Sequence, residues 1–191
     1  MPFAYYDRLT RAQQRIYRRS DEVMSLRLPG AVALRPPIDE LAAALRGEDR
    51  AAVEAAAQRL HEQVTRAFGV PPCRLRVLHA RPHGHWGELQ GLYTTAERGR
   101  PATVTLWMRT ARQRKVVAFR TFLRTLLHEL CHHLDYEHLR LADSFHTEGF
   151  YKRESSLFHQ LVPERAPAPT DTPQVTQGRS APRRPRGAPG R

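Results

Sequence analysis

The sequence lacks long apolar runs and has few cysteines, and each absence excludes a class of protein. Its first residues, Met1 to Arg8, turn polar at once, unlike a secretory signal. No later apolar run approaches the roughly 20 residues that a transmembrane helix needs. Only two cysteines, Cys73 and Cys131, occur among 191 residues, too few for a disulfide framework. We therefore expect a cytoplasmic protein with no membrane partner.

Lysine is also scarce, since Lys115 and Lys152 are the only two, yet the formal net charge is +12. Nearly all of the positive charge is arginine, an excess that codon bias alone could produce. Four of these residues recur at helical spacing near the N-terminus and are called the arginine ridge here: Arg8, Arg11, Arg15 and Arg18. Two interpretations stay open, a solvated helix face or a ridge that contacts nucleic-acid phosphates without sequence preference.

The composition changes at Pro163, after which Pro, Ala, Thr, Gln, Gly and Arg dominate. Such a segment cannot bury enough apolar surface to offset the entropy of ordering. We expect one folded domain over residues 1–162 and a disordered tail over 163–191. A length of 162 residues is enough for a single domain with a real core.

Hydrophobic periodicity predicts an α+β fold. Helices are expected over 5–24, from Ile38 to Phe68 with a break near Gly47, over 115–136 and over 147–161, with a loop at 29–37. Strands are expected over 74–79, 88–94 and 103–108. The expected arrangement is a helical N-terminal region, a small three-stranded antiparallel sheet packed on the 115–136 helix, and a C-terminal helix. We expect the third strand to be an edge strand beside a cleft, with Trp107 facing away from the core.

The 115–136 helix carries His128-Glu129-Leu130-Cys131-His132, a His-Glu-x-x-His motif in an apolar run. Residues four apart on a helix lie one above the other, so the two imidazoles can aim at one metal ion. Glu129 is rotated about 100° from His128 and can serve as a base rather than a ligand. The alternative, histidines that only cap the edge of the core, would bury unpaired polar groups at a cost.

A catalytic zinc needs a third protein ligand, and four downstream residues are candidates. His138 has the metzincin spacing, but Asp135 stands where that motif needs glycine for a sharp turn, and no methionine follows Met108. His146, at the expected start of the last helix, is the better candidate. Glu148 and Glu154 remain alternatives, although first-turn and surface acids suit a helix N-terminus without any metal.

The motif helix followed by a His-x-x-x-Phe box, His146 to Phe150, resembles the SprT-like zinc metalloproteases and the related minigluzincin-type peptidases over about residues 70–162. The resemblance implies that His128, His132 and His146 bind Zn²⁺ and that Glu129 is the general acid and base. Some members of that family cleave proteins crosslinked to DNA, which implies a nucleic-acid partner. The C-terminal zinc ribbon of other members is missing, because no cysteine follows Cys131.

Together these features predict a zinc-dependent metallopeptidase that acts on protein or peptide substrates. Glu129 would take a proton from a zinc-activated water and return it to the leaving amine. Tyr151 is a candidate for stabilising the oxyanion, and a tyrosine at the core edge is its plainer interpretation. Two rivals stay open: a non-enzymatic, nucleic-acid-associated module whose structural zinc has a fourth protein ligand such as His138 or Glu148, and a zinc hydrolase of a non-peptide substrate.

Overall fold

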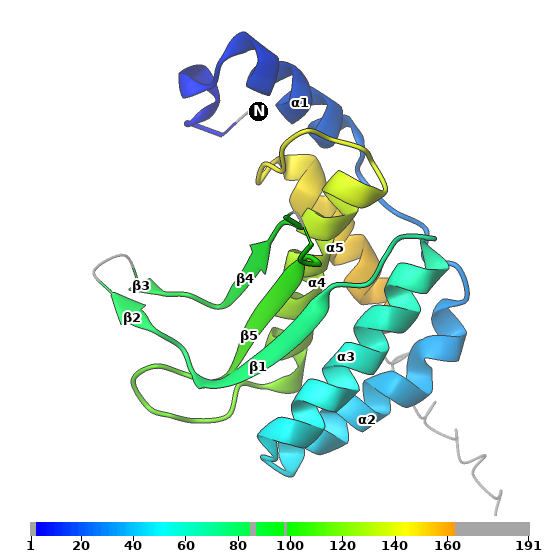
Figure 1. Cartoon of the computed structure of the whole chain (residues 1–191), viewed down its shortest axis with the longest axis vertical. Coiled ribbons are helices and arrows are strands. Elements are labelled where there is room, and N and C mark those ends of the chain that lie inside the picture. Colours follow the sequence, from blue (N-terminus) through cyan, green and yellow to red (C-terminus); the bar gives the residue numbers. More distant parts are fainter. Residues whose placement is uncertain (1–2, 85–86, 98, 163–191) are drawn as a thin grey trace, which may run out of the picture.

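The computed structural model describes residues 3–84, 87–97 and 99–162, and the fold is α+β (Figure 1). The expected tail, 163–191, lies outside the described residues, as do His85, Trp86 and Arg98. The helices are η1 (Tyr6–Arg8), α1 (Arg11–Glu22), η2 (Ala31–Leu34), α2 (Arg35–Arg46), α3 (Arg50–Ala67), α4 (Phe119–Glu137) and α5 (Glu148–Leu161). The strands are β1 (Arg74–Ala80), β2 (His83–Gly84), β3 (Gly87–Glu88), β4 (Gly91–Thr94) and β5 (Thr103–Arg109).

The main sheet is mixed rather than antiparallel, which corrects the expected pairing. Its strand order is β1-β5-β4; β5 pairs antiparallel with β4 and parallel with β1. Between β1 and β5 the chain forms the β2–β3 hairpin and then β4. The strand β5 then pairs with both β4 and β1 and lies between them. The sheet therefore has β1 and β4, not β5, at its edges.

The expected role of the third strand is wrong for the same reason. Residues 103–109 form the central strand β5, whose backbone is paired on both sides. Trp107 is only 8% exposed, so its side chain is not available to pack against a substrate. The strand beside the cleft is β4, which leaves Leu92 45% exposed.

The outer edge of β1 is occupied by side chains of α3. For example, Glu54 accepts a hydrogen bond from the Val77 N–H at 2.7 Å, and Gln58 accepts one from the Leu75 N–H at 2.7 Å. His61 likewise accepts one from the Cys73 N–H at 3.0 Å. A strand edge paired in this way cannot take up a further strand. On the other edge of the main sheet, that of β4, the described contact of this kind is the one from the Tyr93 N–H to the Glu129 side chain.

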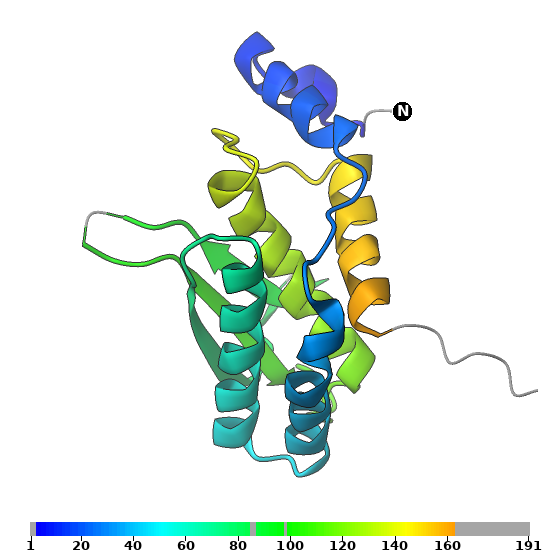
Figure 2. The same ribbon diagram turned by 90° about the vertical axis from the view of Figure 1, so that its right-hand side faces the viewer.

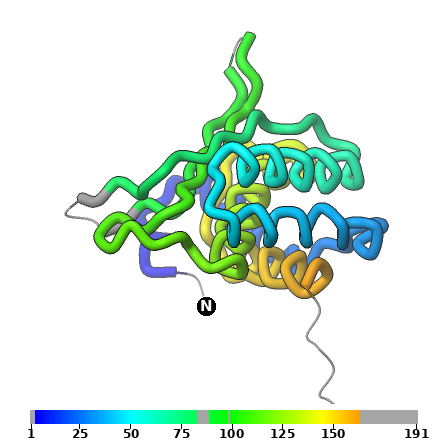
Figure 3. Tube along the Cα trace, turned by 90° about the horizontal axis from the view of Figure 1, so that it is seen from below, coloured from blue at the N-terminus to red at the C-terminus, as the bar shows by residue number. Residues whose placement is uncertain are grey.

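The helices cover one face of the sheet, and α4 packs against both β4 and β5. Helices α2 and α3 lie side by side, as the view from below shows (Figure 3). The α4 helix begins at Phe119, later than expected from the apolar pattern, because the preceding residues pair with β5: the Val117 N–H donates to the Met108 carbonyl at 2.8 Å. The prolines expected in a loop, Pro36 and Pro37, lie in the first turn of α2, where a missing N–H costs nothing.

The N-terminal helix α1 lies at the end of the molecule where α5 begins (Figures 1 and 2). A capping box between Thr10 and Gln13 starts it, which is why it is shorter than the 5–24 expected. The backbone N–H of Gly149 donates to the Asp21 carboxylate at 2.9 Å and joins α1 to α5. Within the described ranges no helix has both the length and the apolar character to cross a bilayer.

Candidate metal centre

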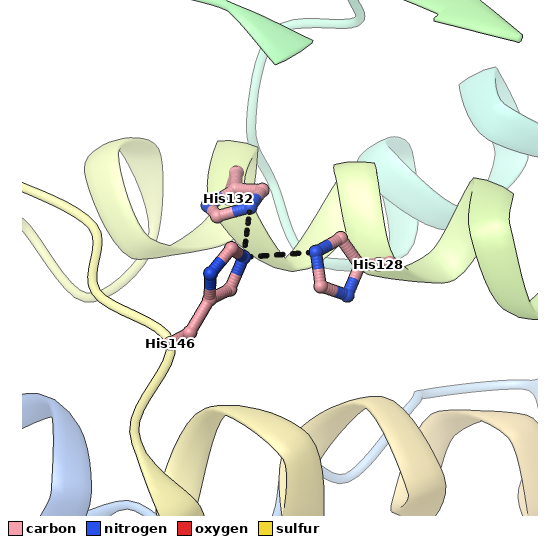
Figure 4. Close-up of side chains that lie close together, drawn as sticks. All are labelled: His128, His132 and His146. Carbon is pink, nitrogen blue, oxygen red and sulfur yellow. Dashed lines mark hydrogen bonds between the residues drawn. The ribbon is translucent and has the colours of Figure 1, made fainter. Parts of the chain in front are cut away.

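Three imidazoles converge on one point beside α4 (Figure 4). His128 and His132 come from successive turns of α4, and His146 comes from the loop that leads into α5. The Nε2 atom of His146 lies 3.0 Å from Nε2 of His128 and 3.1 Å from Nε2 of His132. One ligand atom from each of the three residues falls within 4.8 Å of the others. The structure thus brings together the three histidines that the sequence singled out.

The hydrogen bonds on the far side of two rings show that these nitrogens suit a metal ion. Nδ1 of His128 lies 3.1 Å from the Glu154 carboxylate, which only accepts, so Nδ1 carries the proton. Ser144 donates its own proton to Asp135 at 2.7 Å and therefore accepts from Nδ1 of His132 at 2.8 Å. The Nε2 atoms of His128 and His132 are consequently unprotonated, and each carries a lone pair.

These two lone pairs face the same third nitrogen. Neutral His146 has one ring proton and can satisfy at most one of them. A cation among the three atoms would satisfy all of them. Zinc–nitrogen bonds of about 2.0–2.1 Å in a tetrahedral site place their nitrogens about 3.3 Å apart, close to the 3.0 and 3.1 Å found here. The donor set therefore fits a metal ion, although its chemistry does not single out one element.

Partial burial keeps the imidazole of His132 in the neutral form that binds metals. Desolvation, followed by the proximity of His128 and His146, lowers the pKa of His132 to about 3. Desolvation also lowers the pKa of His146. The loop that carries His146 is fixed from the N-terminal segment, where the Tyr5 hydroxyl donates to the His146 carbonyl at 2.8 Å.

Glu129 is held between α4 and the edge strand β4. Its side chain is 5% exposed, and its carboxylate accepts a hydrogen bond from the Tyr93 backbone N–H. A Cβ atom at Gly91 would lie 2.8 Å from both Cγ of Glu129 and Cγ2 of Thr125, and closer still to Oε1 of Glu129. Only glycine leaves room for this carboxylate. Burial raises the pKa of Glu129 to about 7, against the opposing effects of His128 and the Tyr93 N–H.

The three histidines and Glu129 open into a cleft of about 920 Å³. One wall is the strand β4 with the residues that flank it, and the other is the exposed side of α4, including Thr121, Arg124 and Thr125. Tyr151, Ser144 and Glu154 complete the lining around the histidines.

The other candidate ligands lie elsewhere or play other parts. His138 packs its ring against Phe68, with centroids 5.2 Å apart, and does not belong to the cluster. Glu148 is exposed and forms an ion pair with Lys152 at 2.7 Å. Glu154 accepts a hydrogen bond from Nδ1 of His128, the ring nitrogen that points away from the other two histidines. Tyr151 stacks on the His146 ring, with centroids 5.8 Å apart, and lines the cleft, so it stays a candidate for contact with a substrate.

Several residues at the site carried no signal in the sequence. Gly91 and Tyr93 contact Glu129 only because β4 packs against α4. Asp135 is linked to His132 through the hydroxyl of Ser144, which lies in a loop. His133 is rotated about 100° from His132 on α4; it is buried, and it lies 2.7 Å from the Pro71 carbonyl and 3.2 Å from the Tyr93 hydroxyl. The i+1 and i+5 positions relative to His128 thus lie on the side of α4 that contacts β4, and Glu129, at i+1, also lines the cleft beside the histidines at i and i+4.

Comparison of the chain with models of known protein families, with curated proteins and with solved structures found no match. The resemblance to SprT-like and minigluzincin-type peptidases therefore stays a prediction from the sequence.

Proposed function

We propose that this protein is a zinc-dependent metallopeptidase of the SprT-like or minigluzincin type. The observation that carries the proposal is the placement of Glu129 beside three convergent histidines, in a cleft whose wall is an edge strand. Each of these elements occurs in unrelated sites. Their combination supplies a metal position, a base and a binding surface for an extended chain within one cleft.

The three histidines would hold the metal, and Glu129 would move the proton. A zinc ion with three protein ligands lowers the pKa of a bound water to about 7 and polarises a carbonyl oxygen. Glu129 lies one position after His128 on α4, and its carboxylate is fixed by the Tyr93 N–H and by the space at Gly91. From there it can accept a proton from the attacking water and deliver it to the leaving amine.

The two sheet edges support a peptide as the substrate class. Side chains of α3 accept from the N–H groups along the edge of β1, whereas the acceptor described at the edge of β4 is Glu129, a residue of the site itself. The Tyr93 N–H points to Glu129, so the free side of β4 faces the site. An extended peptide that adds to this edge would place its backbone carbonyls beside the histidines, an advantage that a small non-peptide substrate would not use.

The rival interpretation, a closed structural zinc site, finds less support. Within the part of the chain that the structure describes, the cluster has three members. His138 and Glu148, the residues expected to close it, contact Phe68 and Lys152 instead. Structural sites normally have four protein ligands.

The test is hydrolysis by the full-length chain of an unfolded protein substrate and of a peptide panel, with and without a chelator. We expect cleavage that the chelator abolishes and added zinc restores. Glu129→Gln should bind zinc with parental stoichiometry and lose about 10²–10⁴-fold in rate, whereas the matched control Glu148→Gln, on an exposed acid, should keep its activity. Parent protein that binds zinc but cleaves nothing would refute peptidase function. A Glu129→Gln rate within about tenfold of the parent would refute the role of Glu129.

A further inference from the structure

A buried arginine on α5 lies behind the candidate metal centre. The side chain of Arg153 has no exposed surface, and its guanidinium donates to the carbonyls of Ser20 and Val23 at the end of α1. It also donates to the hydroxyl of Ser20 at 2.9 Å and to Oδ1 of Asp135 on α4 at 2.8 Å. One side chain thus joins α1, α4 and α5.

The chain of polar contacts continues from this arginine to a candidate metal ligand. Asp135 is fully buried and uses its second oxygen, Oδ2, to accept from the Ser144 hydroxyl at 2.7 Å. The same hydroxyl accepts from Nδ1 of His132 at 2.8 Å. Arg153, Asp135, Ser144 and His132 therefore form a continuous series in which every contact is 2.7 or 2.8 Å.

The direction of each bond fixes the imidazole. Arg153 holds the Asp135 carboxylate in place, and the Ser144 hydroxyl donates its hydrogen bond to that carboxylate. A lone pair on Oγ of Ser144 is then free to accept a hydrogen bond from Nδ1 of His132. This sets the tautomer of His132 with Nε2 unprotonated, the form that a metal needs. Ser144 lies two residues before His146, so the same hydroxyl also ties the loop of the third histidine to α4.

Packing alone does not account for the series. Burying an arginine and an aspartate carries a large desolvation cost for each ion, and apolar residues of similar size often serve stability as well or better. His128, by contrast, is held by a single carboxylate, Glu154, whose side chain is 14% exposed. The buried series is thus the more elaborate of the two supports, and it ends on a residue of the metal cluster.

We propose that Ser144 and Asp135 are positioning residues for His132, with Arg153 fixing Asp135, and that metal affinity depends on this series. The proposal rests on the metal centre of the proposed function and adds the residues that set its affinity. It also makes the end of α1 part of the site's support, through the two carbonyls and the hydroxyl that hold Arg153.

The test is the affinity of the full-length, metal-free protein for Zn²⁺ and Co²⁺, measured by competition with a chelator of known affinity. Ser144→Ala removes the hydroxyl from a half-buried loop position and leaves the Arg153–Asp135 pair in place, so the metal-free variant should unfold within a few degrees of the parent. Its metal affinity should fall by about 10–100-fold, the usual effect of losing a group that orients a ligand. Ser155→Ala, which removes a half-buried hydroxyl whose described partner is His159, should bind as the parent does.

The Co²⁺ visible spectrum adds a readout that a loss of stability alone would not change. We expect the bands of the loaded Ser144→Ala protein to shift or weaken, because the His132 ring is no longer fixed, and those of Ser155→Ala to match the parent. Parental affinity and an unchanged spectrum in Ser144→Ala would overturn the positioning role while leaving the metal centre in place. A parent protein that binds neither ion would overturn both the metal centre and its support.

Discussion

The contact between Gly91 and Glu129 allows the catalytic proposal to be tested without altering any group that does chemistry. In Gly91→Ala the new methyl would lie 2.8 Å from Cγ of Glu129 and 2.8 Å from Cγ2 of Thr125. Carbon atoms in contact prefer about 3.5–4.0 Å, so the Glu129 side chain must move by roughly 1 Å or β4 must lift from α4. The three atoms nearest to this methyl belong to Glu129 and Thr125, not to the histidines.

A displacement of about 1 Å at a reacting group can cost roughly 10²-fold in rate, and complete loss of a general base costs about 10²–10⁴-fold. We therefore expect Gly91→Ala to lower the rate of zinc-dependent hydrolysis by at least about 10²-fold. Zinc binding should remain stoichiometric. Overpacking should also lower the free energy of unfolding by about 1–3 kcal/mol.

The assay pairs hydrolysis rates with zinc content and a denaturant titration of each variant. Gly47→Ala is the matched control, since its methyl would meet the nearest carbonyl oxygens at an ordinary 3.6 Å and its φ of −75° suits alanine. Folded, zinc-loaded Gly91→Ala protein that hydrolyses substrate within about threefold of the parent, far inside the expected loss, would refute the position assigned to Glu129.

Three further predictions concern the ligands, the pH dependence of stability and the positive surface. His146→Ala should lose zinc as completely as His132→Ala, while His138→Ala keeps it; metal analysis with the opposite result would favour His138 as the ligand. Burial lowers the pKa of His61 from 6.5 to about 4, so the unfolded chain takes up this proton first as the pH falls. His61 should therefore contribute its full stabilisation above about pH 6.5 and lose about 3 kcal/mol of it toward pH 4; denaturant titrations in which His61→Gln shows the same decline as the parent would contradict this. The arginine ridge is exposed, and we propose that it contacts DNA, with log affinity falling by roughly 0.9 per log unit of salt for each phosphate neutralised. Charge reversal along the ridge and deletion of residues 163–191 should each flatten that slope, and no binding of long DNA at about 50 mM salt, where this term is strong, would remove the nucleic-acid partner.

The sequence was sufficient to predict the α+β class and the meeting of three histidines. Both follow from local rules: His128 and His132 lie one helical turn apart, and His146 stands at the expected start of the helix that follows. The buried position of His133 agrees with its rotation of about 100° from His132 on the same helix. Helix geometry transfers directly from sequence to structure, so residues placed by α4 alone were placed correctly.

The order of the strands could not be read in the same way. Alternation identifies a strand but not its neighbour, and the connection from β1 to β5 passes through a hairpin and β4 before the parallel pair forms. The wrong order put Trp107 at an edge and hid the contact of Gly91 with Glu129. The series from Arg153 to His132 could not be predicted because it joins two helices and a loop through residues that, taken singly, look like ordinary surface polar groups.

The central claim is tested most directly by a crystal structure of the zinc-loaded protein, with the metal located by anomalous scattering and its stoichiometry measured in solution. The account predicts one zinc per chain, bound by Nε2 of His128, His132 and His146, with the fourth position free of protein ligands and open to the cleft beside Glu129. Zinc held by a different set of residues, or closed off by a fourth protein ligand, would contradict it.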